Sequence, residues 1–241
     1  MHTVPEGDAA ARRTLLVALA HPDDEIGCAG TMALHAALGH RVVMLFLTRG
    51  EMTEALGPLG AAEVAARRTE HAHEAAGILG AEARLLDFAD TRIEVSADAT
   101  HQLAREIAVV RPDAVITWGD AWRRGPRHPD HRATGELIRG AITLARITRV
   151  VTPLAPHREP APVYTIREPH SQLPAAAVDI GAHTGTLFEL ARFYRERVGW
   201  PPQPWLEERI GSAGARWGCA AAEEFDAWES PPGLRATLFE S

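Results

Sequence analysis

The sequence has little cysteine, no long apolar run and no excess of basic charge. Its 241 residues include two cysteines, Cys28 and Cys219, too few for a disulfide framework or a cysteine-rich zinc site. No apolar run approaches the roughly 20 residues that cross a bilayer, and residues 1–13 contain no apolar segment of signal-peptide length. The net charge is −7 without a basic block, so nucleic acid is not an expected partner. We therefore expect a cytoplasmic protein without a membrane span.

Short apolar runs alternate with helical patterns along the first 150 residues. Continuous apolar runs of this kind are typical of strands that are covered on both faces. Strands are expected at 14–20, 41–48, 83–89, 112–119 and 147–154, and helices at 30–40, 61–80, 96–111 and 131–146. The alternation predicts an α/β fold with a Rossmann-like, mostly parallel sheet flanked by helices.

The last 90 or so residues follow a different pattern, with prolines concentrated between 153 and 174. Further strands are expected at 161–168 and 175–181, and further helices at 182–196 and 202–218. No internal repeat or low-complexity linker interrupts the chain. We expect a single domain, 1–241, in which a Rossmann-like core (13–150) carries a C-terminal elaboration of strands and helices (151–241). The stretch GWPPQPW (199–205) is compatible with a lid or with a contact in a homo-oligomer.

A histidine and three carboxylates follow the first expected strand, in the stretch HPDDE (21–25). In an open parallel sheet, ligands bind beyond the carboxyl ends of the strands, where the strand order reverses. Catalytic zinc needs about three protein ligands and an open position for water, and His21 and Asp24 are suited to supply two of these ligands. Acidic residues in a first helical turn also interact favourably with the helix dipole. This stretch alone is compatible with either a metal site or a helix cap.

A second cluster, RHPDHRATGEL (127–137), follows the loop after the fourth expected strand and contains His128, Asp130 and His131. If the strand order is 3-2-1-4-5, strands one and four are neighbours across the reversal point. The two clusters would then meet at one crevice. Their meeting favours a joint metal site over a solvated, histidine-rich loop.

These residue types suit metal-assisted hydrolysis of an acyl–nitrogen bond. His21, Asp24 and His131 are expected to bind the metal and leave one position open for water, whose pKa zinc lowers towards 7. Asp23 is free to act as general base. His128 is expected to stabilise the oxyanion or to protonate the leaving amine. Asp130 is expected to orient a neighbouring histidine.

Together, the stretches AHPDDE (20–25) and HPDHRAT (128–134) resemble the PIG-L (LmbE-like) family of zinc N-deacetylases. The resemblance covers about residues 13 to 150, and more loosely 178–180 and 221–225. It implies removal of an N-acetyl group from an N-acetylglucosamine-type conjugate, a small-molecule substrate, with Zn²⁺ or another divalent metal such as Fe²⁺. The family pattern gives the same roles as the chemistry: metal ligands His21, Asp24 and His131, base Asp23, and catalytic His128 supported by Asp130.

The resemblance also implies residues that bind the substrate. Members of the family carry an Arg-x-x-Glu on the helix after the second strand, and RRTE (67–70) supplies it here. Arg67 is the arginine expected to hold a substrate hydroxyl or phosphate, with Arg68 as the alternative register. Asp90 lies where relatives use an aspartate to bind sugar hydroxyls.

The sequence departs from some relatives at one position. They carry a tyrosine two residues before the catalytic histidine, where this chain has Pro126. The only tyrosines, Tyr164 and Tyr194, are distant in sequence. Oxyanion stabilisation is therefore expected from zinc and His128, or from an arginine of the preceding loop, where Trp122 is also a candidate for stacking on a sugar ring. The candidate arginines are Arg123, Arg124 and Arg127.

Two other functions fit the same scaffold. One is an amidase that removes a larger acyl group from an amino sugar, and the other is a non-catalytic sugar- or metal-binding protein. The intact set of ligands and base favours an enzyme. Histidines outside the two motifs, among them His35, His71 and His157, are mostly expected on the surface or at helix ends, and Cys28 is expected to pack as an apolar residue.

Overall fold

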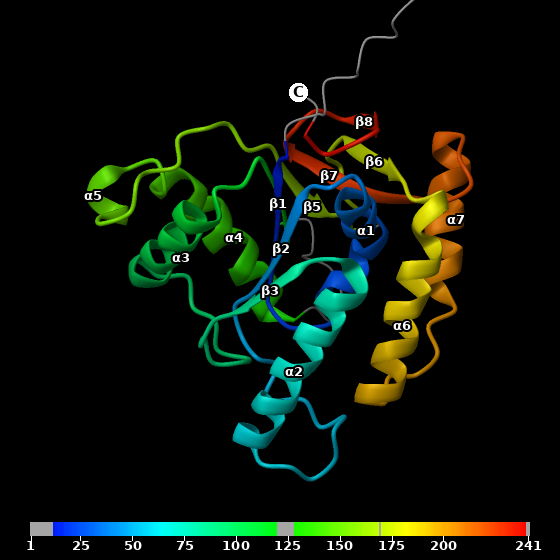
Figure 1. Ribbon diagram of the computed structural model, residues 1–241, viewed down its shortest axis with the longest axis horizontal. Helices are drawn as coiled ribbons and strands as arrows, with labels where there is room; N and C mark the ends of the chain where they lie inside the picture. Colours follow the sequence, from blue (N-terminus) through cyan, green and yellow to red (C-terminus); the bar gives the residue numbers. More distant parts are fainter. Residues whose placement is uncertain (1–11, 120–127, 169, 240–241) are drawn as a thin grey trace, which may run out of the picture.

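The computed structural model describes residues 12–119, 128–168 and 170–239. Its centre is an eight-stranded sheet with helices on both faces (Figure 1). The strands are β1 (Thr14–Leu19), β2 (Arg41–Phe46), β3 (Glu82–Leu85), β4 (Ala114–Thr117), β5 (Val163–Ile166), β6 (Ala175–Asp179), β7 (Ala222–Glu229) and β8 (Gly233–Arg235). Their order is β3-β2-β1-β4-β5-β7-β6-β8. Strands β1 to β5 are parallel, whereas β7 runs antiparallel to β5 and β6, which confirms the mostly parallel α/β fold.

Alternate residues of β1 enter two separate cores. Leu15, Val17 and Leu19 face the core under α1 (Ala29–Ala37), α2 (Ala61–Leu79) and α6 (Thr184–Val198). Leu16 and Ala18 face the core under α3 (Ala97–Val110), α4 (Pro129–Leu144) and α5 (Thr148–Val151). A further helix, α7 (Trp205–Trp217), packs on β6 and β7. Because both faces are covered, the buried strands contain few polar residues.

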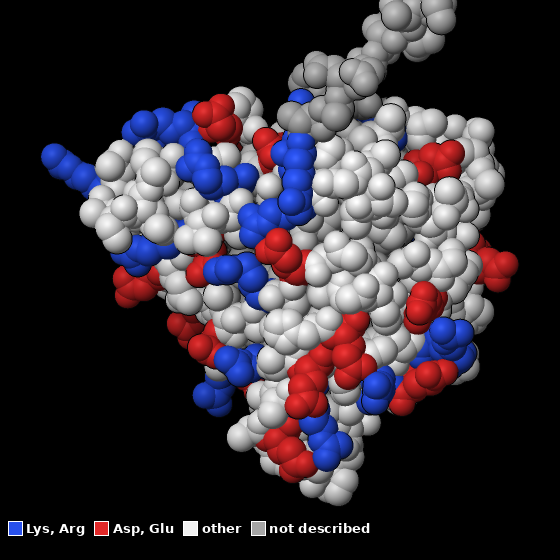
Figure 2. Space-filling view, in the orientation of Figure 1, with Lys and Arg blue, Asp and Glu red and all other residues white. Residues whose placement is uncertain are grey.

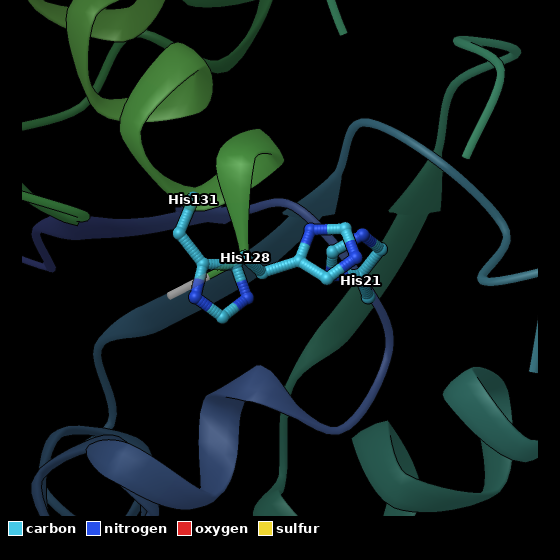
Figure 3. Close-up of side chains that lie close together, drawn as sticks. All are labelled: His21, His128 and His131. Atoms are coloured by element: carbon cyan, nitrogen blue, oxygen red, sulfur yellow. The ribbon is translucent and has the colours of Figure 1, made fainter. Parts of the chain in front are cut away.

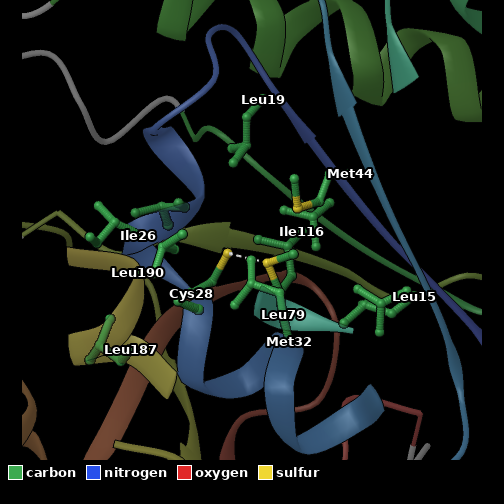
Figure 4. Close-up of a cluster of buried hydrophobic side chains, with 14 of the residues drawn as sticks. Leu15, Leu19, Ile26, Cys28, Met32, Met44, Leu79, Ile116, Leu187 and Leu190 are labelled. Atoms are coloured by element: carbon green, nitrogen blue, oxygen red, sulfur yellow. Dashed lines mark hydrogen bonds between the residues drawn. The ribbon is translucent and has the colours of Figure 1, made fainter. Parts of the chain in front are cut away.

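The core beneath α1 and α6 includes a cysteine (Figure 4). The side chain of Cys28 is fully buried, and its Sγ lies 3.8 Å from the Sδ of Met32. Burial raises the pKa of the Cys28 thiol well above its usual range. This confirms that Cys28 packs as an apolar residue.

Two helix ends follow their sequence signals. The Oγ of Ser96 accepts a hydrogen bond from the backbone N–H of Ala99, as expected of an N-cap. Helix α2 ends at Gly80, whose φ of 66° suits a glycine. The end of α2 and the start of α3 therefore lie close to their expected positions.

The strand expected at 147–154 is wrong. This segment forms the short helix α5, which packs on α3, and the fifth strand of the parallel set is instead Val163–Ile166. The β-branched residues of segment 147–154 favour a strand locally. In the fold only Val151 of α5 is fully buried, against the core under α3 and α4, so packing decides the local structure.

Strands β7 and β8 were not expected from the sequence. Strand β7 carries several carboxylates, a composition that is depleted in strands. Two of them are buried with specific partners: Glu223 accepts hydrogen bonds from the backbone N–H groups of Gly30 and Thr31, and Asp226 pairs with Arg167. Glu223 thus satisfies free N–H groups in the first turn of α1. No helix in the described part of the chain is long and apolar enough to cross a membrane.

Candidate metal centre

The two His/Asp clusters meet at the carboxyl ends of β1 and β4. The loop after β1 carries His21, and the start of α4 carries His128 and His131 (Figure 3). The ring centroid of His21 lies 4.5 Å from that of His128 and 5.4 Å from that of His131. Strands β1 and β4 are neighbours in the sheet, at the reversal of strand order that the sequence predicted.

Asp24 lies between two of the imidazoles. Its Oδ1 is 3.1 Å from Nε2 of His131, and its Oδ2 is 3.6 Å from Nδ1 of His21. The same Oδ2 accepts hydrogen bonds from the backbone N–H groups of Ala20 and His21. Burial alone would raise the pKa of Asp24, but its interactions with His131 and His21, hydrogen bonds included, hold this pKa well below its usual range. The three predicted metal ligands are therefore brought together, with the carboxylate central.

The other nitrogen of His21 faces two further carboxylates. Its Nε2 lies 3.1 Å from Oδ1 of Asp90 and 3.3 Å from Oδ2 of Asp130. Burial alone would lower the pKa of His21, but hydrogen bonds with Asp130, Asp24 and Asp90 raise it to about 12. Three carboxylates thus surround the two ring nitrogens of His21, and this environment strongly favours a positive charge on the ring.

Asp130 and Asp90 are held by backbone groups. The carboxylate of Asp130 accepts hydrogen bonds from the backbone N–H groups of Thr91 (2.8 Å) and Ile93 (3.3 Å). It lies nearer to His21 than to His128, whose Nδ1 is 3.9 Å from it. Asp90 accepts a hydrogen bond at Oδ2 from the backbone N–H of Met52. These bonds fix both carboxylates against the centre.

The carboxylate of Asp23 pairs with an arginine of α2. Its Oδ2 lies 2.6 Å from an Nη of Arg68, which also donates to the carbonyl oxygen of Pro22. The Arg68 side chain is 2% exposed. Burial raises the pKa of Asp23 to about 6, against the opposing charge of Arg68. The two adjacent aspartates thus have different partners.

The structure does not bring Arg67 to the centre. The Arg67 side chain is half exposed and pairs with Glu63, one turn earlier on α2, at 2.9 Å. Figure 2 shows acidic and basic side chains interspersed over the part of the surface where Figure 1 shows α2. The arginine that reaches the HPDDE loop is the alternative, Arg68. Neighbouring residues lie about 100° apart around a helix axis, so only one of the two can face the loop.

Trp118, directly after β4, is a residue of the centre that the sequence did not reveal. Its indole ring is stacked on the ring of His131, with centroids 3.9 Å apart and an angle of 7° between the planes. Its Nε1 donates a hydrogen bond to Oδ2 of Asp24 at 3.2 Å. One side chain therefore fixes two of the three predicted ligands.

Several other expectations concern residues near the centre. Trp122 and Pro126 lie outside the described residues, as do the three candidate arginines Arg123, Arg124 and Arg127. Both tyrosines are fully buried, and the hydroxyl of Tyr194 donates to Glu25, so it is not available to an oxyanion. His35, His71 and His157 are buried, whereas most histidines outside the two motifs were expected on the surface or at helix ends.

Two overlapping groups of donor atoms at the centre could hold a divalent metal ion, and neither of them includes Asp24. Nitrogen atoms of His21, His128 and His131 all lie within 4.8 Å of one another, as do donor atoms of His21, Asp90, His128 and Asp130. Imidazole nitrogens and carboxylate oxygens are ligands that Zn²⁺ accepts, and Fe²⁺ binds similar sets. A cation would also relieve the repulsion among the three carboxylates.

The sequence matches the family model described as GlcNAc-PI de-N-acetylase, PIG-L, over residues 16–142. The chain belongs to the PIG-L family. This match covers both His/Asp clusters, so the centre lies within the part of the fold that defines PIG-L proteins. The family resemblance that the sequence suggested is confirmed.

Individual PIG-L relatives are named as deacetylases. The chain is 35% identical to diacetylchitobiose deacetylase of Thermococcus kodakarensis, over 52% of this chain and 47% of that protein. It is 30% identical to 1D-myo-inositol 2-acetamido-2-deoxy-alpha-D-glucopyranoside deacetylase of Nakamurella multipartita, over 72% of this chain and 70% of that protein. The chain thus spans about half the length of the first relative and more of the second.

The fold also matches a solved structure. N,N'-diacetylchitobiose deacetylase from Pyrococcus horikoshii, in complex with an inhibitor, aligns with a TM-score of 0.80 and 24% sequence identity. The alignment covers 91% of this chain and 85% of that chain. The likeness extends beyond the segment matched by the family model, into the C-terminal strands and helices.

Proposed function

We propose that this protein is a divalent-metal-dependent hydrolase that removes the N-acetyl group from an N-acetylglucosamine-type conjugate, with zinc as the metal. The observation that carries the proposal is the convergence of His21, Asp24 and His131 beside a separately held carboxylate, Asp23. The names of the PIG-L relatives support the type of substrate.

His21, Asp24 and His131 would hold the metal. When bound there, a zinc ion supplies Lewis acidity, which acidifies water and polarises the acyl carbonyl. Trp118 keeps the ring of His131 and the carboxylate of Asp24 in place. Asp90 and Asp130 contact His21 from the other side and would orient its ring.

Asp23 would act as the general base. Arg68 engages its Oδ2, which fixes the direction of the carboxylate. Its Oδ1 has no hydrogen-bond partner among the residues that the structure describes, so this oxygen can take a proton from the attacking water. The proton would later be needed by the amine that leaves.

His128 would stabilise the oxyanion. Its Nδ1 accepts a hydrogen bond from the backbone N–H of Asp130 as the N-cap of α4, so the proton of the neutral ring is on Nε2. This N–H can donate to the developing negative charge of the acyl oxygen. The ring is about one third exposed, which is compatible with access by a substrate.

Among the residues that the structure describes, Asp90 and Arg68 are the candidates for contact with the sugar. Asp90 lies at the edge of the centre, where its carboxylate contacts His21 and the backbone of Met52. Arg68 replaces Arg67 in the proposal because it reaches the loop of Asp23.

Acetate release from a panel of N-acetylglucosamine conjugates tests the proposal, with protein that has been stripped of metal and reloaded with Zn²⁺ or Fe²⁺. We expect one metal ion per chain, acetate release by the loaded protein and none by the stripped protein. Faster release of a bulkier acyl group from matched substrates would favour the amidase. Tight metal binding without hydrolysis of any substrate would favour a non-catalytic binding protein.

A further inference from the structure

Asp23 has a backbone conformation that is rare for a residue with a side chain. Its φ is 100° and its ψ is −20°, in the left-handed half of the Ramachandran plot. Such a conformation persists only where the surrounding contacts fix it. Something in this fold must therefore hold residue 23 in place.

Glu25 makes one of these contacts. Its Oε2 accepts a hydrogen bond from the backbone N–H of Asp23 at 2.8 Å. The Glu25 side chain is fully buried, and a buried carboxylate is costly unless donors satisfy it. The second donor is the hydroxyl of Tyr194, which bonds to Oε1. A continuous chain of hydrogen bonds therefore runs from Tyr194 through Glu25 to the backbone of Asp23.

Tyr194 is itself held firmly. It lies on α6, fully buried, where its ring packs on Phe193 and Trp200 with centroid distances of 5.2 Å and 5.3 Å. Helix α6 packs on the short helix that begins at Asp24. It belongs to the C-terminal part of the chain, beyond the segment 16–142 that matches the family model.

The HPDDE loop is thus held from two sides. Arg68 of α2 bonds to the carbonyl oxygen of Pro22 and the carboxylate of Asp23. Tyr194 of α6 acts on the same loop through Glu25. Arg68 contacts the carboxylate itself, whereas Tyr194 and Glu25 act only on the backbone that carries it.

We infer that Tyr194 and Glu25 form a brace that positions Asp23 for proton transfer. The inference rests on the proposed function, in which Asp23 is the general base. Tyr194 and Glu25 are positioning residues, since neither is expected to contact the substrate. Small displacements of a catalytic group can cost a large fraction of the rate, so loss of the brace should lower turnover and leave metal binding unchanged.

The variant Tyr194→Phe tests the brace, because it removes one hydroxyl and retains the packed ring. We expect kcat to fall about tenfold or more, with KM and metal content as in the wild type. In Glu25→Gln, the amide oxygen can still accept from the backbone N–H of Asp23 and the amide N–H can donate to the hydroxyl oxygen of Tyr194. This variant should therefore lose less activity than Glu25→Leu. Leu187→Val is the matched control: it removes a methylene from the same buried face of α6 and should lower Tm but not kcat.

Wild-type protein and Asp23→Asn are assayed in parallel, so that two failures can be told apart. If Asp23→Asn is inactive but Tyr194→Phe keeps wild-type kcat, the brace is contradicted and the proposed function stands. The brace is also contradicted if Glu25→Gln and Glu25→Leu have equal kcat, or if Leu187→Val loses as much kcat as Tyr194→Phe. Wild-type protein that releases no acetate contradicts the proposed function, and the inference with it.

Discussion

The indole ring of Trp118 lies flat on the imidazole ring of His131, with 3.9 Å between the centroids, while its N–H reaches Asp24. These two contacts bind one aromatic side chain to two predicted metal ligands. Outer residues of this kind orient the ligands, and their loss typically weakens metal binding 10–100-fold. We therefore expect the metal affinity of the centre to depend on a residue that has no metal-binding atom.

The variant Trp118→Phe keeps an aromatic ring against His131 and removes the N–H that Asp24 accepts. We expect zinc affinity to fall by roughly tenfold or more, measured by competition with a chromogenic chelator. Trp217→Phe is the control, because the Trp217 indole donates to Glu224 at 2.7 Å, away from the centre. Equal zinc affinity in Trp118→Phe and wild type would show that the hydrogen bond does not orient Asp24.

Arg67 and Arg68 are adjacent in sequence but differ in environment. Arg68→Met leaves the partly buried carboxylate of Asp23 without its partner, and we expect a loss of about 3 kcal/mol in the free energy of unfolding and at least a hundredfold in kcat/KM. Arg67→Met removes only an exposed ion pair and should change stability by less than about 1 kcal/mol. Urea unfolding and acetate release measure the two effects. A larger loss of activity in Arg67→Met than in Arg68→Met would restore the original prediction for Arg67.

His35 makes stability depend on pH. Its Nδ1 lies 2.7 Å from the carbonyl oxygen of Thr31, and its Nε2 accepts the backbone N–H of Leu238, so the folded protein holds the neutral ring. Burial lowers the pKa of His35 to about 4. The unfolded chain binds a proton below about pH 6.5 while the folded protein does not, so stability falls as the pH drops from 6.5 towards 4.

The contribution of His35 to this fall is about 3 kcal/mol between pH 6.5 and 4. Urea unfolding of wild type and His35→Gln across this range measures it. The variant should be less stable than the wild type at pH 7, because it lacks the hydrogen bonds of His35. Its stability should also depend less steeply on pH. Parallel pH profiles for the two proteins would rule out His35 as the source.

The meeting of the two motifs could be predicted because it follows from topology. Continuous apolar runs marked β1, β2 and β4 clearly, and the order β3-β2-β1-β4-β5 brings the loops after β1 and β4 to one edge of the sheet. Residues that follow those strands directly, such as His21, therefore arrive at the expected place. The same reasoning could not assign α5, because a four-residue segment rich in β-branched residues is compatible with either a helix or a strand.

The contacts that support the centre depend on tertiary packing. Nothing in the pair Arg67–Arg68 indicates which arginine faces the HPDDE loop, since the direction depends on how α2 rotates against the sheet. Tyr194 lies 169 residues beyond Glu25 and has no neighbouring motif, so their contact follows from the docking of α6. Trp118, at the end of an apolar strand, has the pattern of an ordinary core residue.

The central claim is that Asp23 transfers the proton while His21, Asp24 and His131 hold the metal. Measuring zinc content and acetate release of Asp23→Asn on the best N-acetyl substrate tests it most directly. The account predicts a zinc content equal to that of the wild type and a kcat lower by a factor of about 10² to 10⁴. Wild-type turnover by zinc-loaded Asp23→Asn would contradict it.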